Sequence, residues 1–569
     1  MFQGAAWLWL SSPSFMSEKH ILISRGITHS THNDHQQQTH IGRSIKISKK
    51  PGTMAVTRVA QLLLQNSVFC IKWLAIISVV ITILYFIYDS HAAGLSHVPG
   101  PFIARYTNLH AFIATWRAGR RGDYLLGMHE KYGGVVRVGP RMVSVADTDA
   151  INTIYNTKLR LNKSESVTVG VPFGRTSPNI ATMRDTQVHG QFRRPIANAY
   201  ALSTLVEYEP RVDDTLRSLF VALDREGAGG ARIDIARWAF YYALDVIGEL
   251  SFGKPIGFLE QGRDVYGLIY KQSVMTNYVR LLTTMPKLHY LLLGNPILGL
   301  FIDPSKNTFH RFSQERVQER ISEFEQPPTK RDTESGRRGP RKPDLLAYFL
   351  DSREKYPDIM TEEQVVSTVI TNIFSGGLAT NALYLIVHHF VAHPAAQKRL
   401  LDEMTASSVT YPVTWTQTQK LPFLNGLIRE STRLHLALNC IMGRDVPPEG
   451  LLLPNGMRLP PGTAVGVKAH CCHGQEQIFG EGPLEFRPER WCRGDGEGEE
   501  EYEARMSKME RGDMSFGYGA RVCIGQNVAR LQMFKVVANL VYKYELLPAG
   551  DIGDAAKREV FCALRRRAD

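Results

Sequence analysis

The chain has 569 residues, 44% of them hydrophobic, and carries a net charge of +12. This size suits one large catalytic domain, and the seven cysteines form no CxxC pair, which argues against a disulfide framework or a zinc site. Lysine and arginine are scattered and no nucleic-acid-binding motif occurs, so the charge predicts contact with membrane lipid or an acidic protein, and no nucleic acid partner.

Residues 1–53 differ in composition from the rest of the chain. They are rich in Ser, His and Gln and show no sustained hydrophobic periodicity. A segment of this kind buries too little apolar surface to offset its conformational entropy. We therefore predict a disordered N-terminal extension, with metal binding by its histidines as the alternative.

The segment Val68 to Tyr88 is apolar except for Lys72. Its length matches the roughly 20 residues that a helix needs to cross a bilayer, and Lys72 near one end can extend to the headgroups. We predict a transmembrane anchor over residues 68–88. Arg58 is the only basic residue between Met54 and Ser67. Four arginines follow the span: Arg105, Arg117, Arg120 and Arg121. This asymmetry places the domain over residues 97–569 in the cytosol.

Four segments in the domain stand out before the C-terminal region. Arg137-Val138-Gly139-Pro140 is typical of an early strand and turn. The segment Asn372 to Asn381 contains a glycine pair, and no Asp or Glu occurs between Glu363 and Asp402. Glu430 and Arg433, at i and i+3, share a helix face and can pair. The fourth segment combines aromatic, proline and charged residues: Phe486-Arg487-Pro488-Glu489-Arg490-Trp491.

One cysteine near the C-terminus lies in a glycine-rich turn, Phe516-Gly517-Tyr518-Gly519-Ala520-Arg521-Val522-Cys523-Ile524-Gly525. Glycines can adopt positive φ there, and the pattern from Gln526 to Leu540 predicts a helix. A thiolate at a helix N-terminus is stabilised by the helix dipole and by N–H groups of the turn. Because such donors also tune a metal bound to the sulfur, we predict an iron-binding thiolate. A buried structural cysteine is the alternative.

The cysteine turn resembles the haem-ligand loop of the cytochromes P-450, F-x-x-G-x-R-x-C-x-G. Its five fixed positions are filled by Phe516, Gly519, Arg521, Cys523 and Gly525. The early strand, the E-x-x-R pair and the F-x-P-E-R-W stretch resemble the same family, in family order. The chain is identified as a member of this superfamily, most similar to fungal pisatin-demethylase-like members. The resemblance implies a mainly α fold with small β-sheets, preceded by a single transmembrane helix, with residues 97–569 as the haem-thiolate catalytic domain.

The resemblance also implies the cofactor, heme b (iron protoporphyrin IX), and its contacts. Cys523 is expected to be the axial iron ligand, and Phe516 to pack near the sulfur. The haem propionates need cations, which the resemblance places at Arg444, Arg521, His189 and Arg193. His189 and Arg193 are i, i+4 on one helix face, and a satisfied core histidine is the alternative for His189. Glu430, Arg433 and Arg490 are expected to form a buried structural triad, which survives only if every charge is paired.

The short tail after Cys523 is too small for a flavin module. The resemblance therefore implies that electrons come from a separate protein, the NADPH–cytochrome P-450 reductase. It also implies a single-pass protein of the endoplasmic reticulum membrane with a cytosolic catalytic domain.

The segment Asn372 to Asn381 departs from the family pattern [AG]-G-x-[DE]-T-[TS], whose acid and alcohol organise proton delivery to bound oxygen. When this segment is aligned with the family pattern by its Asn-Ile-Phe sequence, Leu378 and Ala379 occupy the acid and alcohol positions. Aligned by the glycine pair, Ala379 replaces the acid and Thr380 remains as the alcohol. The glycines are expected to leave room beside the iron. Thr380 is the candidate catalytic residue, and water, Ser375 or a substrate hydroxyl are the other possible proton sources.

Three functions follow from these residues. The leading hypothesis is a monooxygenase that oxidises a small lipophilic molecule with O2 and reductase-supplied electrons, in fungal secondary metabolite biosynthesis. The second is a haem-thiolate isomerase or dehydratase, because members of that kind also lack the acid–alcohol pair. The third is a haem-binding sensor without turnover. NADPH consumption in the presence of reductase separates the third from the two enzymes.

Overall fold

The computed structural model describes residues 51–119, 124–170, 179–301, 307–325, 344–380, 382–436, 440–553 and 559–567. It divides into two compact units, Met1–Ile87 and Tyr88–Asp569. The predicted N-terminal extension lies outside the described residues except for its last three, which form the start of helix α1 (Pro51–Ala92). Proline is favoured at this first helical position because its missing N–H has no partner there in any case.

Helix α1 contains the predicted membrane span. Phe69–His91 contains an 18-residue window with a mean hydropathy of 2.4, and none of that window is buried inside the protein. Phe69, Leu74 and Ile81 are 61%, 65% and 60% exposed, as expected of side chains that face lipid. A second stretch, Glu362–Ala392, is also long and apolar enough, but it is 40% buried and belongs to the core of the second unit.

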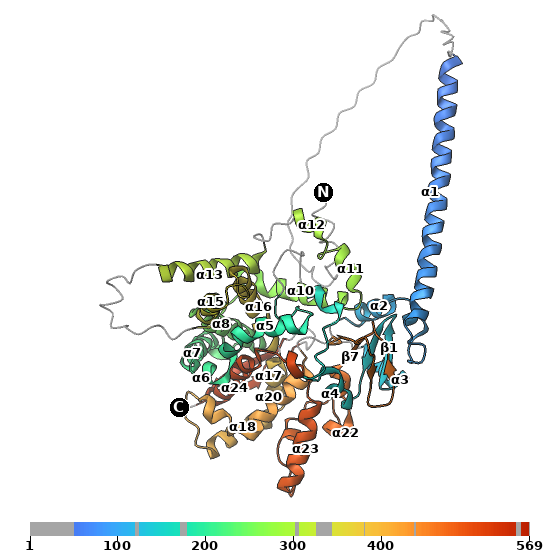
Figure 1. The fold of residues 1–569 in the computed structure, drawn as a ribbon. Helices are drawn as coiled ribbons and strands as arrows, with labels where there is room; N and C mark the ends of the chain where they lie inside the picture. Colours follow the sequence, from blue (N-terminus) through green and yellow to red (C-terminus); the bar gives the residue numbers. More distant parts are fainter. Residues whose placement is uncertain are drawn as a thin grey trace, which may run out of the picture. The chain divides into compact units, whose positions relative to one another are not determined.

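The second unit is mainly helical, as predicted (Figure 1). The helices of its first half are α2 (Leu109–Ala118), α3 (Tyr124–Tyr132), α4 (Asp149–Tyr155), α5 (Thr186–Ile196), α6 (Leu202–Val206), α7 (Glu209–Glu226), α8 (Ile235–Phe252), α9 (Phe258–Gln261), α10 (Leu268–Leu282), α11 (Pro286–Leu291), α12 (Pro296–Phe301) and α13 (Thr308–Glu325). Those of its second half are α15 (Leu345–Lys355), α16 (Glu362–Thr380), α17 (Leu383–Ala392), α18 (Pro394–Ala406), α19 (Trp415–Thr418), α20 (Pro422–Leu434), α21 (Ala469–His473), α22 (Glu476–Phe479), α23 (Glu499–Gly512) and α24 (Gln526–Lys543).

Small sheets complete the fold. Their strands are β1 (Val135–Gly139), β2 (Met142–Val145), β3 (Ile233–Asp234), β4 (Arg444–Asp445), β5 (Leu451–Leu452), β6 (Arg458–Leu459), β7 (Ala464–Val467), β8 (Tyr544–Pro548) and β9 (Phe561–Arg566). They form sheets of order β1-β2-β7-β4, β3-β9-β8 and β5-β6. In the first, β2 runs parallel to β7, and Arg444 of β4 lies opposite Val465. The predicted early strand is β1, which confirms that part of the resemblance.

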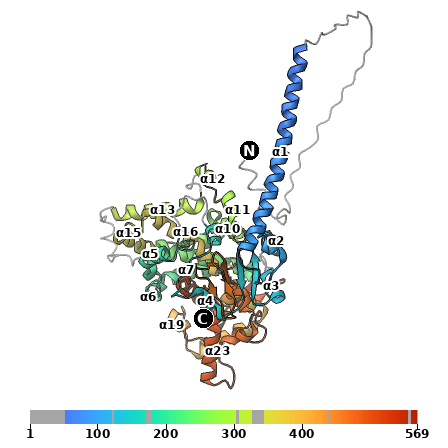
Figure 2. The same cartoon turned by 45° about the vertical axis from the view of Figure 1, so that its right-hand side comes forward.

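The main core lies where α8 packs against α7 and α16. Helix α8 begins at its N-cap Asp234, which accepts a hydrogen bond from the Arg237 N–H, and it ends at Gly253 with φ of 69°. Helices commonly end at a glycine in the left-handed backbone conformation. Nearly all of α8 is buried, as is the face of α24 that meets α16 and α20. Helix α23 extends away from this body in both views (Figure 1, Figure 2).

The structured domain begins earlier than the predicted residue 97. Ala93 and Leu95 are 2% and 0% exposed and pack into the core around the first sheet. Arg141 pairs with Asp89 at 2.8 Å, and the Leu95 carbonyl accepts a hydrogen bond from Arg137 Nη1 at 3.3 Å. The residues between the apolar span and position 97 therefore contribute to the domain core.

Candidate functional site

The turn that carries Cys523 has the backbone geometry that its glycines predict. Gly517 and Gly519 have φ of 79° and 67°, values that disfavour any residue with a side chain. A Cβ at Gly519 would overlap the carbonyl oxygen of Tyr155, so glycine is required there for a second reason. The Cys523 N–H donates to the Phe516 carbonyl at 2.9 Å, which closes the turn. Helix α24 follows from Gln526, as predicted.

The sulfur of Cys523 lies in a recess of the protein. Its side chain is solvent-accessible, yet surrounding protein desolvates it and raises the pKa of the thiol. The backbone N–H groups of Gly525 and Gln526, which hydrogen-bond the sulfur, and the nearby Arg193 guanidinium act in the opposite direction and lower that pKa. These N–H groups lie at the start of α24, so the predicted donors to the sulfur are in place. Phe516 is partly buried against the main core, and the Arg530 guanidinium lies 5.7 Å from its ring centre.

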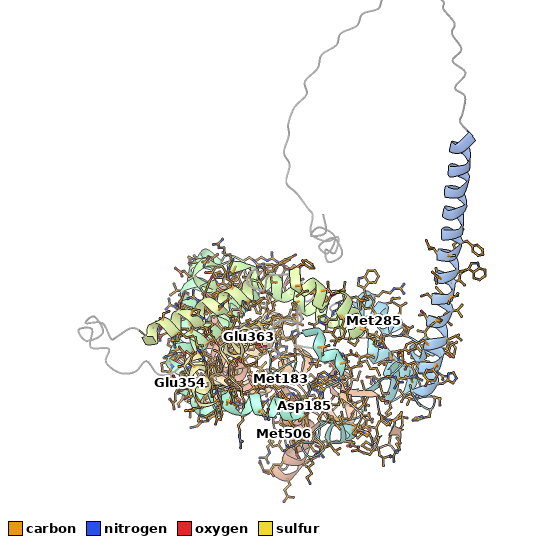
Figure 3. The ribbon with its side chains drawn as sticks, turned by 45° about the horizontal axis from the view of Figure 1, so that its top comes forward. Met183, Asp185, Met285, Glu354, Glu363 and Met506 are labelled. Carbon is orange, nitrogen blue, oxygen red and sulfur yellow. The ribbon has the colours of Figure 1, made fainter. Side chains whose placement is uncertain are left out.

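Arg521 connects the cysteine turn to the start of α5. Its Nη1 donates to the Met183 carbonyl at 3.0 Å, and its Nη2 donates to the Arg184 carbonyl at 2.9 Å. Met183 and Asp185, labelled in Figure 3, lie at this junction. Burial and the neighbouring Arg444 lower the pKa of Arg521 to about 10. The guanidinium is therefore crowded by other positive charge.

The remaining predicted propionate ligands surround the same region. Arg193 Nη1 donates to the Val522 carbonyl at 2.7 Å, next to the cysteine. Burial, together with Arg521 and other nearby cations, lowers the pKa of His189 to about 3, so this imidazole is neutral. Arg444 is 6% exposed, and its guanidinium lies 4.7 Å from the ring centre of Tyr155. Burial also lowers the pKa of Arg444.

Sequence reasoning missed one basic residue in this region, Lys163. It forms an antiparallel bridge with Arg444, and its Nζ donates to the Ala181 carbonyl at 2.7 Å. Burial, together with the nearby Arg444 and Arg521, lowers the pKa of Lys163 to about 7. No motif marks this lysine, because it reaches the site only through the pairing of its segment with β4.

The donor set fits an anionic, iron-bearing group. Five basic side chains gather there: Lys163, His189, Arg193, Arg444 and Arg521. The nearby carboxylates are engaged elsewhere, since Asp185 caps α5 and Asp445 pairs with Arg184 at 2.9 Å. The buried Nε of Arg521 has no hydrogen-bond partner among the described residues. Haem propionates would supply the missing negative charge, and the Cys523 sulfur would supply the iron ligand.

No group of three or more His, Cys, Asp or Glu side chains that could hold a metal ion occurs among the described residues. A single thiolate is a sufficient protein ligand when a porphyrin supplies the other donors to iron. The predicted roles of Cys523 and of the cations agree with this arrangement.

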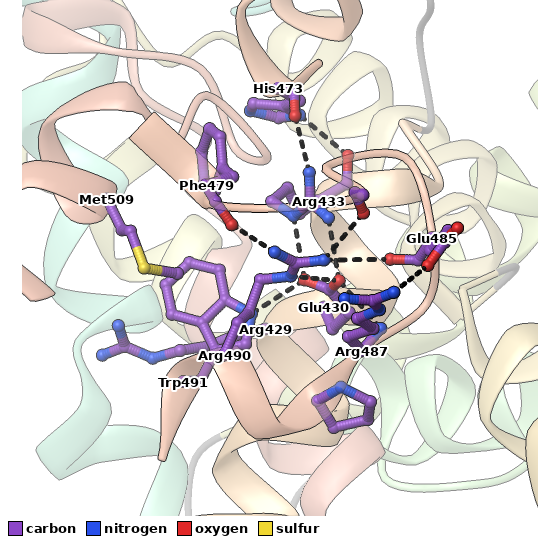
Figure 4. Close-up of polar contacts among 12 residues, drawn as sticks. Arg429, Glu430, Arg433, His473, Phe479, Glu485, Arg487, Arg490, Trp491 and Met509 are labelled. Atoms are coloured by element: carbon purple, nitrogen blue, oxygen red, sulfur yellow. Dashed lines mark hydrogen bonds and ion pairs between the residues drawn. The ribbon is translucent and has the colours of Figure 1, made fainter. Parts of the chain in front are cut away.

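The predicted charge triad is present and fully paired (Figure 4). Glu430 and Arg433 are both 0% exposed. Arg433 binds Glu430 in a bidentate manner, with Nε to Oε2 at 2.9 Å and Nη2 to Oε1 at 2.8 Å. Arg490 Nε donates to Glu430 Oε1 at 2.8 Å, and the Trp491 indole N–H donates to Oε2 at 2.9 Å. Each oxygen of the buried carboxylate therefore has more than one donor.

His473 links this triad to the cysteine turn. Arg433 Nη1 donates to the His473 carbonyl at 2.7 Å, and His473 Nδ1 donates to the Arg433 carbonyl at 2.8 Å. The other ring nitrogen, Nε2, accepts from the Met514 N–H at 3.0 Å, two residues before Phe516. Burial lowers the pKa of His473 to about 4, so the neutral Nδ1–H tautomer serves both bonds. The histidine therefore has a structural role.

Helix α16 passes close to the cysteine turn. The Tyr200 hydroxyl donates to Asn372 Oδ1 at 2.6 Å, and the Asn527 side-chain amide of α24 donates to the Tyr200 carbonyl at 3.0 Å. Tyr200 is near enough to Cys523 for the thiolate charge to raise the Tyr200 pKa, although burial is the larger cause. One turn beyond Asn372, Ser375 is exposed on an otherwise largely buried helix. The side chain of Thr380 lies outside the described residues.

Gly376 and Gly377 have a packing role in helix α16. A Cβ at Gly376 would overlap the side chain of Ile247, and one at Gly377 would lie 2.9 Å from Phe240 Cε2. Both glycines therefore face α8 and allow the two helices to approach closely. The sequence shows that these residues are small, but it does not show which neighbouring residues require their small size.

A family model described as "Cytochrome P450" matches residues 99–566. The chain belongs to the cytochrome P-450 family. It is 32% identical over 462 residues to a cytochrome P-450 monooxygenase of Aspergillus terreus (strain NIH 2624 / FGSC A1156), which covers 79% of this chain and 90% of that relative. It is 30% identical over 463 residues to the cytochrome P-450 monooxygenase cicH of Emericella nidulans, covering 79% and 88%, and 29% identical over 450 residues to vrtE of Penicillium aethiopicum, covering 78% and 83%.

Membership in this family makes haem the cofactor and a redox partner the electron source. The relatives are monooxygenases, which supports the leading hypothesis over the isomerase and sensor alternatives. The similarity to pisatin-demethylase-like members stays a prediction.

Proposed function

We propose that the protein is a haem-thiolate monooxygenase with heme b, which oxidises a small lipophilic molecule in fungal secondary metabolite biosynthesis. The observation that supports it most is the recess around Cys523, where a helix N-terminus supports the sulfur and basic side chains lack carboxylate partners. Electrons would come from the NADPH–cytochrome P-450 reductase. The bound haem would supply the oxygen chemistry, which thiolate donation favours.

The chain's own residues would bind and orient that cofactor. Cys523 would hold the iron, with the Gly525 and Gln526 N–H groups limiting the charge on the sulfur. Arg444 and Arg521 would bind propionates, with Arg193 and His189 beside them. Glu430, Arg433 and Arg490 would fix α20 and, through His473, the start of the cysteine turn. Thr380 remains the proposed catalytic alcohol.

Proton delivery is where this chain would differ from the family pattern, because α16 lacks the acid. Ser375 Oγ is exposed on this helix and can hold or pass a proton through water, and a substrate hydroxyl could do the same.

We expect product formed per NADPH to be low with substrate analogues that lack hydroxyl groups and to recover with the native substrate. The measurement compares NADPH consumed, product and released hydrogen peroxide in the reconstituted reductase system. Ser375→Ala should lower the product yield further if that hydroxyl takes part, and Ser407→Ala in an exposed turn is the matched control. Turnover of a hydroperoxide without NADPH or reductase would instead favour the isomerase alternative. Tight coupling with every analogue would show that water or Thr380 replaces the lost acid completely.

Helix α1 would anchor the catalytic domain in the endoplasmic reticulum membrane, with the domain in the cytosol. Residues 68–88 should suffice to anchor a reporter protein. A chain that starts at Asp89 should leave sedimented membranes after a carbonate wash and keep its haem.

A chain that starts at His97 should also leave the membrane but be less stable, by about 2 kcal/mol for the lost burial of Leu95 alone. Urea unfolding of the two truncated forms measures this difference. Carbonate-resistant attachment of the form that starts at Asp89 would instead reveal a second membrane contact, for which exposed Leu291, Leu300 and Phe301 are candidates.

A further inference from the structure

Lys163 is held beside Arg444 by backbone pairing. The Ser164 N–H donates to the Gly443 carbonyl at 3.0 Å, and the Asp445 N–H donates to the Asn162 carbonyl at 2.9 Å. These bonds fix the segment around Lys163 against β4 on one side. On its other side, the Lys163 N–H donates at 3.1 Å to the Arg184 carbonyl, which also accepts a hydrogen bond from Arg521 Nη2. The lysine therefore lies between two of the cations proposed to bind haem.

The amine of Lys163 has few partners for its charge. Its Nζ has three donor hydrogens, and the Ala181 carbonyl is its one hydrogen-bond acceptor among the described residues. The charged and titratable groups that face it are Arg444 of β4, Arg521 of the cysteine turn, Arg193 and His189 of α5, and the Cys440 thiol. None of these is a carboxylate. An ammonium group half-buried among other cations is stabilised when an anion binds there.

We propose that Lys163 is a further haem-propionate ligand that acts with Arg444 and Arg521. This proposal rests on the proposed haem site and adds to it a residue that the family motifs do not contain. A lysine differs from its arginine neighbours because it can lose its proton near neutral pH when buried. Lys163 should therefore contribute its own pH dependence to haem retention.

The direction in which haem affinity changes with pH follows from the pKa values of Lys163 in the haem-free and the haem-bound protein. Without a nearby anion, burial and Arg444 lower the pKa of Lys163 to about 7. A propionate beside the amine raises that pKa, because it stabilises the charged form. Below about pH 7 the amine is charged in both the haem-free and the haem-bound protein. Above it, haem binding requires proton uptake, so haem affinity falls by up to about tenfold per pH unit until the raised pKa is reached.

The test measures how fast the holoprotein transfers haem to excess apomyoglobin between about pH 6 and about pH 9. The wild-type protein should lose haem faster as the pH rises. Lys163→Met should lose haem about tenfold faster than wild type at the lowest pH, with a much flatter pH profile. Lys163→Arg should retain haem well and also show a flat profile, because guanidinium remains charged.

Lys158→Met, at an exposed lysine of the same connection, is the matched control and should behave like wild type. The proposal is overturned if Lys163→Met retains the wild-type rate and pH profile, or if Lys158→Met changes them equally. A normal Lys163→Arg protein shows that the position tolerates substitution. Failure of the proposed function itself would look different, because the wild-type protein would then lack the spectrum of thiolate-ligated haem.

Discussion

Replacing Cys523 by alanine is expected to abolish the carbon-monoxide difference spectrum typical of thiolate-ligated haem. The backbone of the turn should survive the change, since the hydrogen bond from the Cys523 N–H to the Phe516 carbonyl does not involve the sulfur. The basic side chains that face the propionates are also untouched. The variant should therefore still bind some haem while losing the thiolate signal completely.

Two other buried cysteines provide matched controls for this experiment. Cys471 and Cys492 are 6% and 8% exposed and lie in apolar clusters, outside the residues of the turn itself. Burial raises the pKa of Cys492 to about 11, so this thiol stays protonated and is a poor metal ligand. Alanine at either position should leave the spectrum intact. A thiolate spectrum that persists in Cys523→Ala would refute the assignment of the iron ligand.

The local features of the site could be predicted from sequence, whereas its long-range contacts could not. The cysteine turn and the start of α24 depend on residues within a dozen positions of each other, so glycine placement and helix pattern were sufficient. Lys163 and Arg444 are brought together by pairing of distant segments, and no local pattern records that. A glycine pair has the same appearance in sequence whether it faces a cofactor or a helix, and only the packing against Ile247 distinguishes the two.

The packing of the residues just before position 97 could not be predicted, for a related reason. The sequence shows where the apolar span ends and where a Pro-Gly-Pro break follows, but Leu95 is buried only because the first sheet lies beside it. Helix α23 begins in an acidic stretch of the chain before the cysteine turn. It is mostly exposed, and it is helical because Glu499, Glu500 and Glu501 occupy its first turn, where negative charge favours the helix dipole.

Glu430→Gln should destabilise the protein by about 3–5 kcal/mol, the usual cost of breaking a buried ion pair by neutralising one partner. Glu430 accepts hydrogen bonds from Arg433, Arg490 and the Trp491 indole within 2.9 Å. With glutamine, Arg433 remains 0% exposed without a carboxylate. Because Arg433 also holds His473, and His473 holds Met514, the loss should reach the cysteine turn. We expect the thiolate spectrum to disappear at lower urea concentration than in wild type.

Glu510→Gln makes the same chemical change in a solvent-exposed pair and is the matched control. Glu510 bonds Arg429 at 2.8 Å, but their side chains are 54% and 39% exposed, so its loss should cost at most about 1 kcal/mol. Arg433→Lys tests the geometry separately, since an ammonium group cannot reproduce the bidentate contact and the bond to the His473 carbonyl together. Equal urea midpoints for Glu430→Gln and Glu510→Gln would contradict the structural role of the triad. If Glu430→Gln loses its haem signal at a much lower urea concentration than its helical structure, the triad mainly supports the cysteine turn through His473.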